Sequence, residues 1–500
     1  MLTRLHVSGF KNLVDVDIHF GPFTCVAGAN GVGKSNLFDA ILFLSALAEK
    51  PFLEAATVVR DEGGGGGGLR NLFTMLPDGG TSLMHFEAEM LIPGEGLDDL
   101  QQRVQATNTF LSYRLELNYR TGTEDKPRPG IVLHREELSY IKQGEAREHL
   151  PFRHGIAWRG SVVEGRRTSP YISTDDEPAT VKLHQDYGKT GGSGGRPLTF
   201  RADTLPRTVL SRVNGQESPT ATLARREMLS WRLLQLEPSA LRTPDKFDSP
   251  QRMTTTGRHL PATLHRLTVR EPRTCDLIAN RLAELIEDVQ RIRVDRDDTR
   301  ELFTLMLEER EGGELPAKSL SDGTLRFIAL ATLEMDPEET GLICLEEPEN
   351  GIHPQRIRAM IELLRDTAVD VSLADDEDNP LRQVIINTHS PAVVAQIPDD
   401  CLLFAEKQPQ LADRLRFAPG QAASGHGNNV IKGLSFGCLP GTWRETKLKA
   451  GTIPRGKILD YLNATFSPWE LSVPGERRVI DRPELGEQLG LPLPTEFELD

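Results

Sequence analysis

One short pattern, G-x-x-x-x-G-K-S at residues 28–35, constrains this chain more than any other feature. It lies between two apolar stretches, a predicted strand at Phe23 to Ala27 and a predicted helix at Leu37 to Leu47. The glycines let successive backbone N–H groups turn toward phosphate oxygens, and the N-terminus of the following helix favours anions. The predicted phosphate-binding residues are Gly28, Ala29, Asn30, Gly31, Val32, Gly33, Lys34 and Ser35.

Two side chains of this loop carry specific predictions. Lys34 is expected to reach the β and γ phosphates of a nucleotide, and Ser35 is expected to bind Mg²⁺. An ordinary glycine turn is the alternative, since the chain contains 44 glycines. The strand before the loop and the helix after it favour the phosphate site.

Length and composition exclude several classes of protein. A chain of 500 residues predicts one large composite domain with insertions, or two to three domains. The longest apolar runs fall well short of the roughly 18 residues that cross a bilayer, and residues 1–7 read as a strand, so we expect a cytoplasmic protein without a membrane partner. The five scattered cysteines indicate buried thiols.

The charge distribution leaves a nucleic-acid partner open. A net charge of −15 argues against general coating of nucleic acid. Residues 151–280 nevertheless hold 20 Lys and Arg against 13 Asp and Glu, so DNA is a possible local partner. The cations around Arg258 to Arg270 are either a solvated face or a DNA contact.

The periodicity of apolar residues outlines the rest of the chain. Two strands flank a turn at residues 9–12, and period-two patterns predict an antiparallel β region over residues 81–143. Residues 144–220 read as polar and irregular, and the glycine-rich segments 63–68 and 191–195 as flexible loops. Strands are expected at 302–307, 341–345, 384–387 and 402–406, and helices at 221–236, 275–289, 320–335 and 355–368. The expected units are residues 1–150 and 291–405 as two lobes, 151–290 as an inserted region and 406–500 as a C-terminal extension.

Acidic residues and a histidine end two of these strands. Glu346 is expected to hold Mg²⁺, and the adjacent Glu347 to orient and deprotonate an attacking water. Neighbouring residues on a strand end point to opposite faces, so the two carboxylates cannot share one task. His389 closes the next strand and is expected to contact the γ-phosphate or the water. Together with Lys34, these residues predict phosphoanhydride hydrolysis.

This ordered set resembles a known family. It comprises residues 28–35, 320–324, 342–347, 350–353 and His389, and it is similar to the ABC-type ATPase head of the RecF and structural-maintenance-of-chromosomes group. The stretches from His6 to Leu13 and from Leu345 to Pro354 resemble most closely the ATPase half of the overcoming-lysogenization-defect family. The resemblance implies an α/β P-loop fold with a mixed central sheet, flanking helices, an antiparallel β subdomain, a helical signature lobe and insertions.

The resemblance also implies a shared active site. Ser321, Asp322 and Gly323 match the signature loop, which closes on ATP held by a second copy of the chain, so ATP and Mg²⁺ would lie between two copies. Glu346 replaces the usual aspartate of this strand, and His353 replaces the aspartate of the following loop. The family also has a characteristic glutamine in the loop that joins the two lobes, and we assign no residue of this sequence to that position.

Relatives in this family often carry a C-terminal nuclease domain of the Toprim type. Residues 402–406 supply a strand ending in Glu406, but no Asp-x-Asp follows. We therefore expect no nuclease in this chain and a separate effector or nuclease as partner.

Three functions are compatible with these features. The first is an ATP-dimerised ATPase coupled to DNA transactions or to sensing of foreign or phage DNA, in antiviral defence or repair. The second is a nucleotide-gated scaffold that holds a partner inactive, with slow turnover. The third is a RecF-like loader of DNA repair factors.

Overall fold

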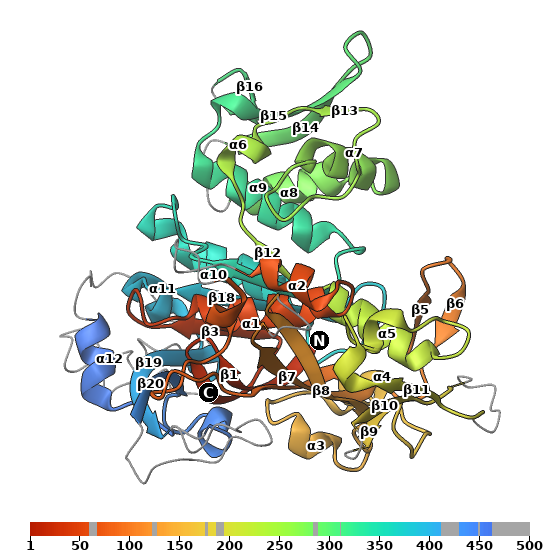
Figure 1. Ribbon diagram of the computed structural model, residues 1–500. Helices are drawn as coiled ribbons and strands as arrows, with labels where there is room; N and C mark the ends of the chain where they lie inside the picture. Colours follow the sequence, from red (N-terminus) through yellow and green to blue (C-terminus); the bar gives the residue numbers. More distant parts are fainter. Residues whose placement is uncertain are drawn as a thin grey trace.

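The computed structural model describes residues 1–59, 68–122, 128–175, 179–186, 195–283, 289–310, 312–411, 430–448 and 451–462. Two large sheets with a helix between them and a separate lobe, in which helices surround a small sheet, form most of this part of the chain (Figure 1). Of the predicted glycine-rich loops, residues 63–67 and 191–194 lie outside it.

The larger sheet is antiparallel and has the strand order β11-β10-β9-β8-β7-β4-β1-β2. Alternate residues of β1, among them Leu5 and Val7, are buried in the core, as the period-two pattern predicts. The strands span β1 Leu2–Phe10, β2 Leu13–His19, β4 Met84–Leu91, β7 Phe110–Arg120, β8 Gly130–Tyr140, β9 Ile172–Asp175, β10 Thr180–Leu183 and β11 Leu198–Arg201.

The second sheet carries the predicted phosphate-binding residues 28–35, which we call the phosphate loop. Its strand order is β12-β17-β18-β3-β19-β20. Its first five strands are parallel, and β20 pairs antiparallel with β19. The strands span β3 Phe23–Ala27, β12 Arg232–Leu234, β17 Gly341–Glu346, β18 Arg382–Thr388, β19 Leu402–Leu411 and β20 Val430–Gly437. The predicted mixed central sheet is therefore confirmed.

Helix α1 (Ser35–Leu47) is buried between the two sheets. Its Phe43 stacks on Phe10 of β1, with ring centroids 5.7 Å apart. Alternate residues of β3 face different cores: Val26 lies in the cluster with α1, whereas Cys25 faces the opposite cluster with α10 (Ile357–Asp366) and α11 (Pro391–Gln396). Helices thus cover both faces of this sheet, which is why its strands read as nearly continuous apolar runs.

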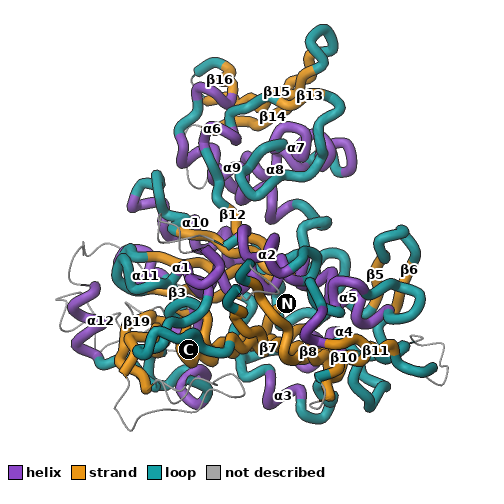
Figure 2. Tube along the Cα trace, viewed as in Figure 1, coloured by secondary structure: helices purple, strands orange, loops and turns teal. Residues whose placement is uncertain are grey.

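The helical lobe stands apart at the top of Figures 1 and 2. Its long helix α9 begins after Ser321, whose hydroxyl accepts the backbone N–H of Thr324 at 3.1 Å. Buried Arg382 of β18 donates to the carbonyls of Leu333 and Asp336 at the end of α9, and so fastens the lobe to the central sheet. The lobe contains α6 Pro238–Leu241, β13 Asp245–Lys246, α7 Leu260–Arg270, α8 Thr274–Ala283, β14 Val289–Asp297, β15 Leu302–Glu309, β16 Glu314–Pro316 and α9 Asp322–Met335.

Three predictions from periodicity are wrong in part. The region 144–220 is regular, since β9, β10 and β11 extend the antiparallel sheet. The helix expected at 221–236 ends at Leu229, because the residues that follow pair with β17 as strand β12. The described part of the helix expected at 275–289 spans Thr274–Ala283, residues 284–288 lie outside the described residues, and Val289 belongs to strand β14 instead. Pairing into a sheet overrides the local pattern in these segments, and for β12 the partner strand β17 lies more than a hundred residues away.

Five further helices and a two-stranded ribbon complete the description. None of the described helices is long and apolar enough to cross a membrane. All five cysteines are free, and all but Cys401 are buried. The remaining elements are α2 Phe52–Val58, β5 Glu95–Leu97, β6 Arg103–Gln105, α3 Ala146–His149, α4 Ile156–Val162, α5 Pro219–Leu229 and α12 Arg455–Leu462.

The segment after β20 is anchored by Arg444. Its buried guanidinium donates to the carbonyl of His19 at 2.6 Å, to the carbonyl of Asp400 at 2.8 Å and to the hydroxyl of Thr24 at 3.1 Å. These three acceptors belong to both sheets and to the connection before β19. Residues 443–446 are thus part of the same packed body.

Candidate functional site

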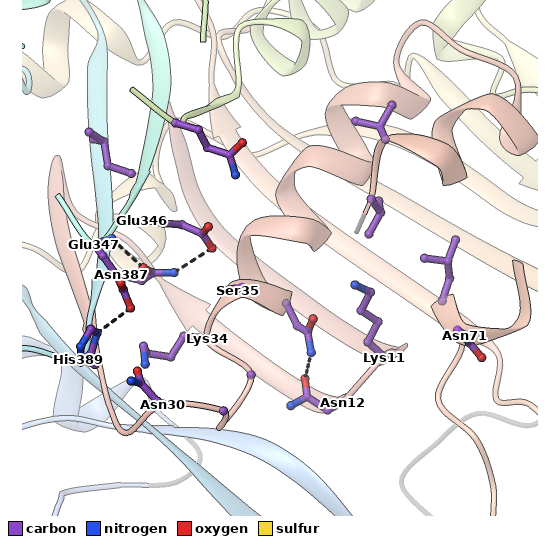
Figure 3. Close-up of a pocket in the computed structure, with 18 of the residues that line it drawn as sticks. Lys11, Asn12, Asn30, Lys34, Ser35, Asn71, Glu346, Glu347, Asn387 and His389 are labelled. Atoms are coloured by element: carbon purple, nitrogen blue, oxygen red, sulfur yellow. Dashed lines mark hydrogen bonds and ion pairs between the residues drawn. The ribbon is translucent and has the colours of Figure 1, made fainter. Parts of the chain in front are cut away.

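The predicted site residues follow the ends of three neighbouring parallel strands, β3, β18 and β17, at one edge of the central sheet. The phosphate loop follows Ala27, Glu347 follows the last residue of β17, and His389 follows Thr388 of β18. The carboxyl ends of parallel strands in open α/β sheets are where ligands bind. Residues far apart in the chain therefore meet at this edge (Figure 3).

The glycines of the phosphate loop are required by geometry. Gly33 has a φ of +101°, and a Cβ there would lie 2.2 Å from Nδ2 of Asn12. That amide donates to the carbonyl of Val32 at 3.1 Å and accepts from Asn36 at 2.9 Å, so it supports the loop from the β1–β2 turn. Gly31 also has a positive φ, +73°. Only glycine adopts such a chain path without strain.

Lys34 turns its ammonium group back over this loop. Its Nζ donates to the carbonyls of Gly28 at 2.7 Å and Ala29 at 3.0 Å. Burial lowers the pKa of Lys34, and the carboxylates of Glu347 and Glu349 oppose that shift. A cation held over a glycine-rich loop at the N-terminus of α1 fits a polyphosphate, so the residues present suit the predicted nucleotide.

Glu347 is held in an unusual conformation beside His389. Its φ is +45°, a region that non-glycine residues seldom occupy and that is concentrated at functional sites. The carboxylate contacts Nδ1 of His389 at 2.6 Å and accepts from the amide of Asn350 at 2.9 Å. Its backbone N–H donates to the carbonyl of Asn387 at 2.9 Å. These contacts fix the direction of the carboxylate.

Glu346 ends β17 opposite Asn387 of β18, whose amide donates to its carboxylate at 3.4 Å. Ser35 begins α1 across the same cleft (Figure 3). A hydroxyl and a carboxylate are the oxygen ligands that Mg²⁺ takes beside phosphates. The pair therefore fits the predicted metal role.

Glu349 adds a buried carboxylate behind this arrangement. It accepts from the hydroxyl of Thr388 at 2.5 Å, next to the backbone of His389. Burial raises the pKa of Glu349. The contact ties the loop after β17 to the end of β18.

One cleft of about 1980 Å³ contains most of the predicted residues. We call it the nucleotide cleft. Gly28, Ala29 and Val32 are not among the residues that line it. Its predicted lining residues are Asn30, Gly31, Gly33, Lys34, Ser35, Glu346, Glu347 and His389.

The signature residues Ser321, Asp322 and Gly323 do not line the nucleotide cleft of their own chain. They form the exposed N-terminus of α9, where Asp322 pairs with Arg242 at 2.5 Å. A Cβ on Gly323 would lie 2.7 Å from the carbonyl oxygen of Gly351, so this position is packed against the loop after β17. His353 in that loop is exposed and accepts the backbone N–H of Gln355.

The structure also brings unpredicted side chains to the cleft. Gln235 lines it directly after β12, and Asn387 lines it at the end of β18. Arg326 of α9 lines it too and donates to the carbonyl of Asn350. Gln235 was missed because a three-residue strand after a helix carries almost no periodic signal.

Much of the predicted cationic cluster in the lobe is paired internally. Arg266 forms an ion pair with Asp336, and His259 contacts Asp245 at 2.8 Å. These contacts favour a structural face over a DNA contact at those two residues.

Comparison with known proteins identifies the family. Residues 23–91 and 199–395, more than half of the chain, match the family described as "AAA domain, putative AbiEii toxin, Type IV TA system". The chain belongs to this family. The matched residues of this AAA domain include the phosphate loop, the strand ending in Glu346 and His389.

Curated relatives match a shorter part of the AAA-domain protein. It is 35% identical over 108 residues to the DNA replication and repair protein RecF of Anaeromyxobacter sp. strain K, which covers 20% of this chain and 29% of that protein. RecF of Porphyromonas gingivalis is 44% identical over 46 residues, 9% of this chain and 13% of that protein. The chain thus spans less than a third of the length of these relatives. The predicted likeness to the RecF group is confirmed, and the closer likeness to the overcoming-lysogenization-defect family stays a prediction.

Solved structures with a similar fold include an Smc head bound to the C-winged helix domain of ScpA, with a TM-score of 0.44 and 12% identity over 88% of this chain and 98% of that one. The SMC head domain from Thermotoga maritima has a TM-score of 0.34 and 12% identity, over 84% and 99% of the two chains.

Proposed function

We propose that this AAA-domain protein binds ATP with Mg²⁺ and hydrolyses it in the nucleotide cleft. The observation that carries this assignment is the juxtaposition of Lys34, over the phosphate loop, with the hydrogen-bonded pair of Glu347 and His389. Hydrolysis needs charge neutralisation and a base for water, and Lys34 and Glu347 would supply these from one sheet edge.

Each residue then has a separate task. Lys34 neutralises charge on the phosphates, while Ser35 and Glu346 would hold Mg²⁺, which supplies further charge neutralisation when bound. The Glu347 carboxylate orients a water and accepts its proton. His389, hydrogen-bonded to Glu347 at 2.6 Å, keeps that carboxylate aimed and contacts the water or the γ-phosphate.

We further propose that a second copy completes the site with Ser321, Asp322 and Gly323. Support comes from the position of these residues at a helix N-terminus, outside their own nucleotide cleft. The free N–H groups of that helix end are suited to cap phosphate oxygens. The exposed face of Asp322 leaves the loop accessible to another molecule.

Complementation between two inactive variants tests the shared site. Lys34→Ala removes the phosphate cation, and Ser321→Arg blocks the signature loop. Each variant alone should lose ATP hydrolysis. A mixture should contain dimers with one intact composite site, so an equal mixture recovers about a quarter of wild-type turnover if copies pair at random around a twofold axis.

Two results would contradict these proposals separately. If the Ser321→Arg protein alone hydrolyses ATP at the wild-type rate, the shared site is wrong although hydrolysis stands. If Lys34→Ala leaves turnover unchanged, the assignment of the nucleotide cleft itself is wrong.

The cellular role that these features support best is an ATPase coupled to DNA transactions or to sensing of foreign DNA, acting with a separate effector. Support comes from the RecF relatives, which are named as DNA replication and repair proteins, and from the family description, which mentions a putative toxin and a Type IV TA system. Duplex DNA should stimulate ATP hydrolysis, and the stimulation should fall steeply with added salt. Absence of both stimulation and binding at low salt would contradict a DNA role.

A further inference from the structure

A second cluster of chemically active side chains lies on the antiparallel sheet, among residues with no part in the nucleotide cleft. One ring nitrogen each of His6 and His85 and one carboxylate oxygen of Glu87 all lie within 4.8 Å of one another. The two rings meet edge to face with centroids 5.2 Å apart. Two histidines and a carboxylate are a common protein ligand set for Zn²⁺.

The strand register brings these residues together. His6 of β1 is paired directly with Glu87 of β4, and His85 lies two residues earlier on the same face of β4. The alternate residues Val7 and Phe86 point into the core on the opposite face. Adjacent antiparallel strands therefore hold the cluster on a rigid support.

A carboxylate contacts one ring nitrogen of each histidine. Nε2 of His6 lies 2.9 Å from Asp15 of β2, and Nδ1 of His85 lies 3.2 Å from Glu116 of β7. This leaves Nδ1 of His6 and Nε2 of His85 for another partner. Metal-bound histidines usually donate their second N–H to a carboxylate in this way, which fixes the tautomer and ring orientation.

Glu87 is only loosely held by its basic neighbours. Its carboxylate lies 3.5 Å from Arg4 and 3.4 Å from Arg114. Arg4 makes closer contacts elsewhere, with Asp17 at 2.8 Å and Glu89 at 2.9 Å. The Glu87 carboxylate can therefore turn toward a cation while Arg4 keeps its ion pairs with Asp17 and Glu89.

Exposure of the cluster allows a metal ion to enter. The side chain of His85 is 4% exposed, whereas those of His6 and Glu87 are 21% and 17% exposed. The ligand atoms of a tetrahedral zinc with bonds of about 2.0–2.1 Å lie roughly 3.3 Å apart. Small side-chain rotations would bring the three ligand atoms to this spacing. Water can take the fourth position.

We propose that His6, His85 and Glu87 form a zinc site that joins β1 to β4, with Asp15 and Glu116 orienting the two histidines. The site is separate from ATP hydrolysis. It lies on the strand that leads into the turn bearing Asn12, the residue whose amide supports the phosphate loop.

Titration of the metal-stripped full chain with Zn²⁺ alone tests the site. Wild type should bind one equivalent of Zn²⁺ per chain. His6→Ala and His85→Ala should each weaken that binding at least about 100-fold, because each removes one of three protein ligands. Asp15→Asn should weaken it about 10- to 100-fold, as loss of an orienting partner does. His184→Ala is the matched control, since this partly buried histidine contacts Ser173 instead and should leave binding unchanged.

The nucleotide cleft also contains a histidine and carboxylates, so His389→Ala is titrated in parallel. Loss of zinc binding in His389→Ala with normal binding in His85→Ala would overturn the assignment. A wild-type protein that binds no Zn²⁺ would overturn it as well.

Glu87→Gln, which preserves side-chain shape, covers the case in which the histidine variants fail to fold. Bound to Co²⁺, wild type should show the visible absorption of a tetrahedral ion, and Glu87→Gln should change it. A spectrum that is identical in the two proteins would refute the site.

Discussion

Replacing Glu347 with glutamine is the sharpest test of the proposed chemistry. The change keeps the size of the side chain and alters one oxygen only. Its two neighbours, Nδ1 of His389 at 2.6 Å and the amide of Asn350 at 2.9 Å, can still meet an amide oxygen or nitrogen. The φ of +45° is imposed by the loop and is unaffected by the substitution. What disappears is the capacity to accept a proton.

The size of the effect follows from that single loss. A positioned general base contributes about 10²- to 10⁴-fold to rate, equivalent to roughly 3–5 kcal/mol of barrier. We expect turnover to fall by that factor while ATP affinity stays within about threefold of wild type, because Lys34 and the loop N–H groups remain.

Phosphate release at saturating ATP measures turnover, and calorimetric titration with ATP measures affinity. Glu362→Gln is the matched control, because this carboxylate on the surface of α10 pairs with Arg358 at 3.0 Å and has no contact with the cleft. Turnover of Glu347→Gln within about threefold of wild type, with ATP bound normally, would refute the assignment of Glu347 as the base.

Three further variants probe the loop, the C-terminal anchor and one pH-sensitive contact. Gly33→Ala should weaken ATP binding about tenfold or more in calorimetry, because its Cβ meets Asn12 and the backbone is strained; unchanged affinity would show that the loop relaxes freely. Arg444→Met removes the hydrogen bonds to two buried acceptors, the carbonyl of His19 and the hydroxyl of Thr24, and should lower the free energy of unfolding by about 3 kcal/mol in urea, whereas a change near zero would contradict the anchoring role. The hydrogen bond to Glu89 raises the pKa of His149, so this pair should stabilise the fold fully below pH about 6.5 and lose that contribution as pH rises through the raised pKa. The stability difference between wild type and His149→Gln should shrink with rising pH, and a constant difference would count against this contact.

Local chemistry made much of the site predictable. The phosphate loop can be recognised from the sequence because its glycines, lysine and serine all lie within residues 28–35. The backbone conformation that they require is also local. Glu347 and His389 could be predicted because polar residues that interrupt apolar runs mark the ends of buried strands. Their meeting at one sheet edge then follows from parallel pairing.

Other parts depend on pairings that no short window contains. Strand β12 exists because it pairs with β17, more than a hundred residues later, and only that pairing brings Gln235 to the cleft. Strands β9 to β11 look polar and irregular in sequence because their short length gives little alternation to detect.

By itself the sequence predicted a phosphate-binding loop and determined that carboxylates follow buried strands, since these are local properties of backbone and residue type. Only the tertiary structure decided which distant side chains share a site. His6 and Glu87 face each other because β1 and β4 pair in one register, and a shift by one residue would turn them to opposite faces of the sheet. Ser321 lies outside its own nucleotide cleft although Arg326 of the same helix α9 lines it, because the packing of the helical lobe decides which side of α9 faces the cleft.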